Sequence, residues 1–198
     1  MEASSNGYAG KILQVNLEDG SLEDIYLNRR WIELYVGGGG YATRLLYDLI
    51  DKDVEPLSPR NPLIVMTGPF TGLAAMSPKT IFVSISPLTG FLGKAASSGS
   101  FGTILKRAGY DGIVVKGKAK KPVFLSVVNS VPKLNDASSI WGKGVFETCK
   151  LIKNELNSLK ARIAAIGPAG EKCVNIASVI TDERRAFGRT GFGAIMGS

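Results

Sequence analysis

The stretch NPLIVMTGPFTGLAAMSPKTIFVSISPLTG, residues 61–90, contains two uninterrupted apolar runs at 63–67 and 80–85. Runs of this length without polar breaks are typical of buried strands. Each run leads into a similar turn, GPFTG at 68–72 and SPLTG at 86–90, in which proline presets φ and glycine closes the turn. The repeated pattern predicts two strands whose loops leave the same end of a sheet.

Shorter patterns flank this pair of strands. Residues 11–17 and 21–27 surround an EDG turn and predict a hairpin, and Asn28 caps a short helix that ends before four consecutive glycines. A second helix follows the glycines, and a Ser/Gly-rich loop within residues 94–100 opens another helix that Gly109 ends. Further strands are predicted at 112–116, 122–128, 131–134, 161–166 and 174–181.

Strands and helices alternate without a regular βαβ repeat, which predicts an α+β fold with mixed, mainly antiparallel sheets and several short helices. No linker divides residues 1–198, so a single domain is expected. A helix near 144–159 carries an apolar stripe at helical spacing, formed by Val145, Cys149, Ile152, Leu156 and Leu159. Cys149 is therefore predicted to be an inert core residue. Residues 191–198 alternate small and apolar residues with no helix stop or polar tail, and Ile195 and Met196 would be exposed if nothing followed, which indicates a truncation or a docking point.

The composition excludes several classes of protein. The chain has 198 residues, a formal net charge of +7, 44% hydrophobic residues and no histidine. Neither a disordered chain nor an integral membrane protein is expected, and Ser-His-Asp, Cys-His and His-ligated metal chemistry are excluded within this chain. Two isolated cysteines form no CxxC pair. The first residues lack the features of a secretory signal, so we expect a cytoplasmic protein without a membrane span.

The charge is divided unevenly along the chain. Residues 1–60 carry 6 basic and 10 acidic side chains, and the remainder carries 18 basic and 7 acidic ones. An anionic partner is therefore expected to bind the second part. The lysine run KGKAKK at 116–121 has the composition of a hairpin and no interleaved aromatic residues, so a solvated basic face is a better reading than nucleic-acid binding.

Three glycine-bearing segments could bring backbone amides close to an anion: residues 37–40, 97–102 and 184–189. None matches the P-loop or the dinucleotide-binding fingerprint. For residues 37–40, a helix break with no role in binding is as well supported as an anion-binding loop. The last segment adds Arg184, Arg185 and Arg189, whose guanidinium groups can grip phosphate oxygens in pairs, and its alternative is a solvated loop.

The chain resembles the N-terminal domain of the aldehyde ferredoxin oxidoreductase family over almost its whole length. The segments that carry the resemblance, in chain order, are GYAGKILQVNL, LYVGGGGYATRLLYD, PLSPRNPLIVMTGPFTG, SPLTGF, SFGTILKRAGYDGIVVKGKA, DASSIWGKG, AAIGPAGE and RRAFGRTGFGAIMGS. Agreement in order and spacing at eight places is far more specific than any single glycine loop.

The resemblance implies a tungsten or molybdenum bis-pterin cofactor, with Mg²⁺ between the pterin phosphates and the metal held by pterin sulfurs. It also implies oxidation of an aldehyde to a carboxylic acid, with electrons passed through a 4Fe-4S cluster to ferredoxin. The cluster cysteines and proton-transfer residues belong to later domains of the family. We therefore expect no catalytic residue and no metal ligand within residues 1–198, and no activity from this chain alone. Membrane partners are not implied, and a homodimer is left open.

The resemblance also assigns positions to the cofactor. The family's Arg-Ala-x-Gly-Arg phosphate segment falls on Arg185, Ala186, Gly188 and Arg189, and its Asn-Ser-Gly-Gly loop falls on residues 96–99. Ala96 thus stands where the family has the asparagine linked to Mg²⁺, while Ser98 and Gly99 complete the loop. Gly39 stands where the family has an arginine in a Gly-x-Arg-Gly turn, and Gly40 is the glycine that follows it. Lys79 stands where the family has a second arginine.

These departures remove positive charge and one oxygen ligand from the expected site. We expect that a basic residue nearby in sequence, Lys94, Arg44 or Arg184, points inward to compensate. The competing hypothesis is that the site no longer holds two pterins and the domain is an architectural subunit. A non-catalytic module for a phosphate-rich ligand or nucleic acid is the alternative from a different functional class.

Overall fold

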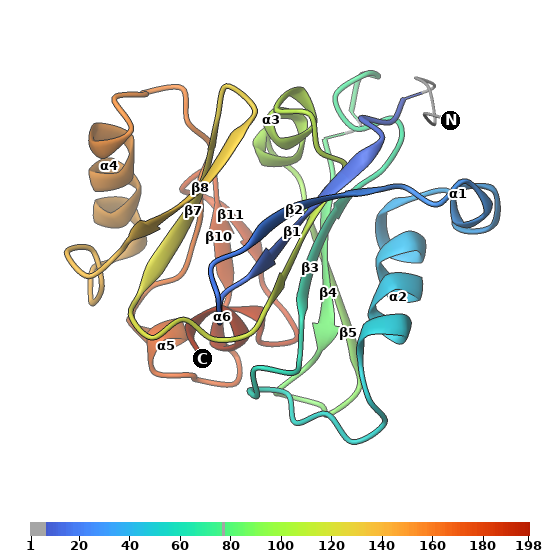
Figure 1. The fold of residues 1–198 in the computed structure, drawn as a ribbon. Helices are drawn as coiled ribbons and strands as arrows, with labels where there is room; N and C mark the ends of the chain where they lie inside the picture. The colour runs from blue at the N-terminus through green and yellow to red at the C-terminus, as the bar shows by residue number, and fades with distance from the viewer. Residues whose placement is uncertain (1–6, 77) are drawn as a thin grey trace.

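The computed structural model describes residues 7–76 and 78–198, and its centre is a six-stranded mixed sheet (Figure 1). The strands are β1 (Lys11–Asn16), β2 (Leu22–Tyr26), β3 (Leu63–Thr67), β4 (Thr80–Ile85), β5 (Leu92–Ser97) and β6 (Gly112–Lys116), in the order β2-β1-β6-β3-β4-β5. Only the β1–β6 pair in this sheet is parallel, and the other pairs are antiparallel. The predicted α+β class with mainly antiparallel pairing is confirmed.

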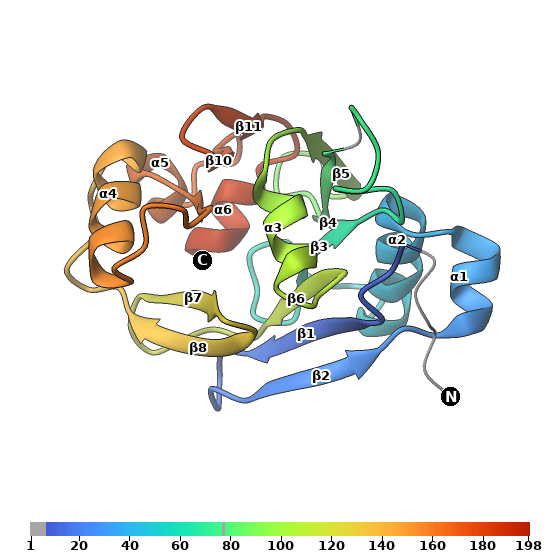
Figure 2. The ribbon, with the colours of Figure 1, turned by 90° about the horizontal axis from the view of Figure 1, so that it is seen from above.

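The other elements cover the two faces of this sheet (Figures 1 and 2). On one face lie α1 (Arg29–Tyr35) and α2 (Gly38–Leu49). On the opposite side lie α3 (Phe101–Arg107), the hairpin of β7 (Val123–Val128) and β8 (Val131–Asp136), and α4 (Val145–Glu155). The C-terminal elements on that side are β9 (Ala164–Ala165), α5 (Pro168–Glu171), β10 (Val179–Thr181), β11 (Arg185–Phe187) and α6 (Phe192–Gly197).

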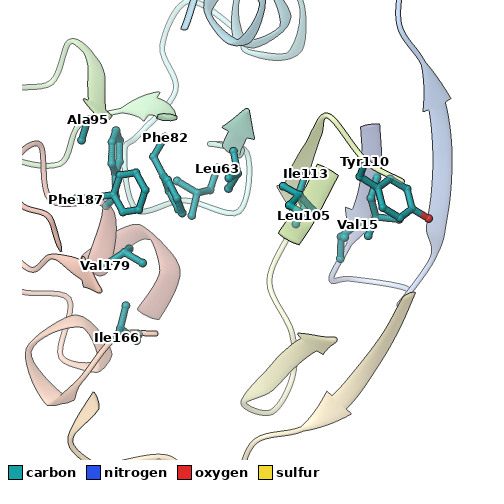
Figure 3. Packing of buried hydrophobic residues seen from close by; sticks show 13 residues of the cluster. Val15, Leu63, Phe82, Ala95, Leu105, Tyr110, Ile113, Ile166, Val179 and Phe187 are labelled. Carbon is teal, nitrogen blue, oxygen red and sulfur yellow. The ribbon is translucent and has the colours of Figure 1, made fainter. Parts of the chain in front are cut away.

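The two apolar strands of the opening stretch supply side chains to both faces. Val65 and Phe82 enter the cluster shared with the C-terminal elements, whereas Ile64 and Val83 pack toward α2. Successive side chains of a strand point to opposite faces, so a strand buried on both sides needs an uninterrupted apolar run. In Figure 3 the ring of Phe82 lies beside that of Phe187, with a centroid separation of 4.1 Å.

The expectation that the two proline-containing turns share one end of the sheet is wrong. β3 pairs with β4 in antiparallel register, with Thr67 opposite Thr80 and Ile64 opposite Val83. The carboxyl ends of neighbouring antiparallel strands point in opposite directions, so GPFTG and SPLTG leave opposite ends of the sheet. Their similar sequences reflect similar turns and not a shared rim.

Several elements differ from the sequence expectation. Residues 94–97, predicted as part of a loop, lie in the edge strand β5, and residues 192–197, for which no element was predicted, form the helix α6. The helix α4 ends at Glu155, so Leu159 lies outside it and is 83% exposed. The strands expected at 161–166 and 174–181 are limited to the short β9 and β10. These elements depend on burial against other parts of the chain, which local sequence does not reveal.

No helix among the described residues is long and apolar enough to cross a membrane. The lysine run at 116–121 lies in the connection between β6 and β7.

The most deeply buried ion pair joins Lys106 at the end of α3 to Asp111 before β6. The Lys106 Nζ atom lies 3.6 Å from Asp111 Oδ1 and also donates to the carbonyls of Gly7, Gly68 and Pro69. The other carboxylate oxygen accepts a hydrogen bond from the backbone N–H of Gly10 at 2.7 Å. Burial raises the pKa of Asp111 and lowers the pKa of Lys106, so each charge depends on the other for compensation.

We therefore expect Lys106→Met to lower the free energy of unfolding by about 3–5 kcal/mol, because it leaves a buried carboxylate without its counter-charge. Lys11→Met is the control, since Lys11 pairs with Asp24 at a more exposed position and its loss should cost about 1 kcal/mol or less. Urea unfolding of both variants measures the difference. Equal losses would show that the buried pair contributes no more than an exposed one.

Candidate anion-binding site

Strand β11 brings Arg185 to the end of the edge strand β5. Arg185 and Phe187 point to the same face of β11, because side chains two residues apart in a strand share a face. Phe187 is buried against Phe82, which fixes β11 on the sheet, and Arg185 stays exposed. The chain then follows β5, with Arg185 beside Gly99 and Thr190 beside Gly93. Figure 2 shows β11 and β5 as neighbours.

At Gly99, the loop after β5 comes close to Asp182 and Arg185 at the start of β11. Its φ of +122° lies in the region that favours glycine, and a Cβ there would stand 2.3 Å from Asp182 Oδ2 and 3.3 Å from Arg185 Cγ. Asp182 Oδ2 accepts hydrogen bonds from the backbone N–H of Ser100 at 2.5 Å and from its hydroxyl at 3.2 Å. Asp182 thus fastens the loop before α3 to the turn that carries Arg185.

A polar cavity of about 450 Å³ opens beside this contact. It is lined by Gly99, Ser100, Cys149, Lys153, Ala161, Arg162, Ile163, Asp182, Glu183, Arg184 and Arg185. Its two carboxylates face cations: Lys153 pairs with Glu183, and Arg162 Nε lies 3.7 Å from Asp182 Oδ1. The hydrogen bond from Lys153 lowers the pKa of Glu183. Among the described residues, Arg184 and Arg185 have no ion-pair partner, which leaves the cavity with surplus positive charge.

The remaining predicted residues lie on or beside β4 and β5. Ala96 is exposed on β5 opposite Ile81, and Thr80 pairs with Ser97, so Lys79 lies beside the end of β5 that continues into Ser98. At Gly39, the second residue of α2, a Cβ would stand 2.9 Å from Lys94 Cδ and 3.7 Å from Ile81 Cδ1.

The structure therefore gathers most of the predicted residues around β5: Lys79, Ala96, Ser98, Gly99, Arg185 and Ala186, with Gly39 and Gly40 at the start of α2. Gly188 and Arg189 are exposed on the segment that follows β11, where a Cβ at Gly188 would stand 3.8 Å from the Cβ atom of Ala186. Of the three candidate compensating residues, Lys94 lies against Gly39 and Arg184 lines the cavity. Arg44 instead pairs with Asp48 and stacks on Trp31 and Tyr47, away from β5.

Sequence reasoning did not find Asp182 or Arg162. Asp182 and Glu183 both adopt positive φ, at 52° and 63°, in the turn between β10 and β11. Strained backbone of this kind in non-glycine residues is often associated with functional sites. An aspartate after a β-branched run was the available signal, but its partner Ser100 lies 82 residues away in the sequence.

Within residues 7–76 and 78–198, no three His, Cys, Asp or Glu side chains are grouped so that they could hold a metal ion. The site consists of guanidinium groups, an ammonium group, glycine backbone and two carboxylates, Asp182 and Glu183, that already accept hydrogen bonds from Ser100 and Lys153. This is a donor set for a phosphate-like anion.

A comparison with protein families identifies the family of this chain. The family model described as "Aldehyde ferredoxin oxidoreductase, N-terminal domain" matches residues 12–198. The chain belongs to the aldehyde ferredoxin oxidoreductase family. The resemblance seen in the sequence motifs is thereby confirmed, and the chain corresponds to the N-terminal domain of the family.

Individual relatives match this family member over nearly its whole length. The chain is 45% identical over 193 residues to the tungsten-containing aldehyde ferredoxin oxidoreductase of Pyrococcus furiosus and 44% identical to that of Pyrococcus abyssi, covering 97% of this chain and 32% of each relative. It is 36% identical to a P. furiosus protein named aliphatic sulfonate oxidoreductase, WOR-like subunit, covering 96% of this chain and 33% of that protein. The chain thus spans about a third of the length of these relatives.

A solved structure shares the fold at a TM-score of 0.95 and 39% sequence identity, covering 97% of this chain and 29% of the other. It is the active site complex BamBC of benzoyl coenzyme A reductase with 1,5-dienoyl-CoA. The fold of this family member is therefore shared with a further oxidoreductase.

We expect Gly99→Ala to destabilise the protein more than Gly142→Ala. Both glycines have positive φ, but a Cβ at Gly142 meets nothing within 4 Å, whereas one at Gly99 collides with Asp182. Urea unfolding measures the free energy of unfolding of both variants. The loss in Gly142→Ala reports the backbone strain alone, and the additional loss in Gly99→Ala reports the collision with Asp182. In an Asp182→Ala background the extra loss at Gly99 should shrink, with a coupling of about 0.5–3 kcal/mol. Strict additivity would contradict the proposed contact.

We also expect Cys149 to be unreactive in the folded protein. It is 1% exposed, and burial raises its pKa to about 11, so the reactive thiolate is on the order of one part in a thousand at pH 8. Cys173 is half-buried and unpaired. Titration with a thiol reagent at pH 8 should detect one fast cysteine in the native protein and two in denaturant. Two fast thiols in the native protein would contradict the burial of Cys149.

Proposed function

We propose that this chain is the cofactor-binding N-terminal domain of an oxidoreductase that oxidises aldehydes to carboxylic acids with ferredoxin as electron acceptor. The cofactor is a phosphate-bearing bis-pterin that carries tungsten, or molybdenum in its place. When bound, such a cofactor supplies the redox chemistry itself, whereas the protein binds and orients it. The tungsten part of the proposal is supported by relatives named as tungsten-containing, and the aldehyde part by the same relatives.

The observation that carries the proposal is the juxtaposition of Arg185 with Gly99 at the end of β5. A guanidinium group offers two parallel donors to phosphate oxygens, and glycine lets backbone approach a ligand without a side chain between them. Asp182 Oδ1 is buried and accepts no hydrogen bond in the described part of the chain, but it lies 3.7 Å from Arg162 Nε, whose positive charge offsets that of the carboxylate. These residues fit a phosphate-bearing ligand. Arg185, Lys79, Ser98 and Gly99 would hold it, and Arg189, exposed after β11, is a further candidate contact.

The residues do not fit an Mg²⁺ ion held by a side chain at position 96. Ala96 is exposed at the place where the resemblance puts a metal-linked asparagine, and it has no side-chain oxygen. Mg²⁺ takes oxygen ligands, so this position supplies none. No step of the proposed function depends on that ion.

The rest of the catalytic apparatus is proposed to lie in the part of the enzyme beyond this domain. A 4Fe-4S cluster takes four thiolates, and this chain holds only Cys149 and Cys173. Large apolar side chains are exposed in the segment after β3, at the end of the sheet where β5 leads to Gly99, among them Met76 at 98% and Leu73, and Phe91 and Leu92 are exposed at the opposite end of β5. We propose that they pack against the remaining domains of the same enzyme, and that the 198-residue chain alone is inactive. A cytoplasmic location is part of the proposal.

Arg185→Ala in the full-length enzyme should lower tungsten and pterin content per polypeptide. Losing one partner of a charge-assisted contact weakens binding by about tenfold to a hundredfold. Metal analysis and pterin release measure the loss, and it should be deepest when tungstate in the growth medium is limiting.

The matched control is Arg107→Ala, an exposed arginine at the other end of α3. It should leave cofactor content unchanged. If Arg185→Ala folds normally and keeps full content, Arg185 belongs to a solvated loop and the proposed site is wrong.

A further inference from the structure

Lys94 lies in the middle of the edge strand β5 and points to the face of the sheet that carries α2. Burial alternates along β5, with Gly93, Ala95 and Ser97 buried and Leu92, Lys94 and Ala96 exposed. Lys94 is opposite Val83, whose side chain packs in the α2 cluster. Lys94 and Ala96 therefore share one face of the strand, on the opposite side from Phe187.

The stem of Lys94 is packed against the start of α2. A Cβ at Gly39 would stand 2.9 Å from Lys94 Cδ and 3.6 Å from its Nζ atom, so the lysine fills the space that a side chain at position 39 would need. The backbone φ of Gly39 is not in the glycine-favouring region. A side chain at 39 would therefore have to displace the end of the Lys94 side chain, whereas the backbone conformation does not favour glycine there.

No charge on the described chain neutralises this ammonium group. None of the ion pairs within residues 7–76 and 78–198 includes Lys94, and the first turn of α2 holds no acidic residue. A lysine on an open surface can turn into water. Lys94 is exposed, but the end of its side chain lies beside the start of α2, the positive end of a helix dipole, where a nearby anion stabilises a cation.

Lys94 is also close to the proposed ligand site. Ala96 lies two residues further along the same face of β5, and the strand then leads to Ser98 and to Gly99 beside Arg185. Cations therefore stand on both sides of this strand, Arg185 on the β11 side and Lys94 on the α2 side. The nearest carboxylate at that end, Asp182, is already engaged by Ser100 and Arg162.

We propose that Lys94 binds the anionic part of the same ligand from the α2 side, with Gly39 kept small to hold the lysine in place. This inference rests on the proposed function, because the ligand is the phosphate-bearing cofactor proposed above. Lys94 makes an electrostatic contact only, so the bond-making chemistry is unaffected by its assignment.

The test uses the full-length enzyme and the variants Lys94→Met and Lys94→Arg. Methionine keeps most of the stem and removes the charge, so the tungstate concentration needed for half-maximal tungsten and pterin content should rise about tenfold to a hundredfold. Arginine keeps the charge and should restore most of the content. Lys120→Met, an exposed lysine in the β6–β7 connection, is the control and should behave as the unmodified enzyme.

A double-mutant cycle tests the role of Gly39. Gly39→Ala should displace Lys94 and reduce cofactor content, but should add no further loss in a Lys94→Ala background. Equal effects of Gly39→Ala in both backgrounds would overturn the contact as the reason for glycine.

The outcomes separate the two proposals. If Arg185→Ala loses cofactor and Lys94→Met does not, Lys94 has no part in binding and the site around Arg185 stands. If neither variant loses cofactor, the proposed function of this site fails as well. Loss in Lys94→Met without recovery in Lys94→Arg would overturn an electrostatic role.

Discussion

The position of Asp111 between three strands is the constraint on which the rest of the structure depends. Its backbone N–H donates to the carbonyl of Lys11 in β1, and its carbonyl accepts from the N–H and hydroxyl of Thr67 in β3, each at 2.8 Å. Its buried carboxylate binds the N–H of Gly10 and faces Lys106 of α3. One residue therefore fixes where the N-terminal hairpin, the central strands and α3 meet, and this fixes β6 as the strand that joins the two halves of the sheet.

The candidate site lies at the other end of α3 from this junction. Lys106 holds the last turn of α3 beside β3, and Ser100, which precedes its first turn, is held by Asp182. The helix is thus fixed at both ends, and the loop that contains Gly99 has little freedom to move away from Arg185. Phe187, buried against Phe82, holds the other side of the contact. The candidate site at this sheet edge is in this way positioned by two buried interactions, one polar and one aromatic.

The charge distribution of the site follows from which cations have partners. Lys106, Lys153 and Arg162 are each close to a carboxylate, so their charges mainly stabilise the fold. Lys94 and Arg185 have no such partner among the described residues and flank β5. The surplus positive charge of the chain after residue 60 is therefore divided between structural pairs and groups that remain available for an anion. The amino-acid composition shows the excess of positive charge, but it does not show which cations are paired with carboxylates and which are not.

The sequence by itself determined the α+β class, the strands at 63–67 and 80–85, the burial of Cys149 and, through its motifs, membership of the family. These follow from local periodicity and from the order of motifs, which need no knowledge of contacts. The edge strand β5 was hidden because Gly93, Ala95 and Ser97 are small residues that become a strand only when packed under Phe187 and α6. The two proline-containing turns lie at opposite ends of the sheet because β3 and β4 pair in antiparallel orientation, which the sequence does not reveal. The contacts of Gly39 with Lys94 and of Gly99 with Asp182 join residues 55 and 83 positions apart. Only tertiary structure could decide them, because a glycine's need for space depends on a neighbour that the chain brings from elsewhere.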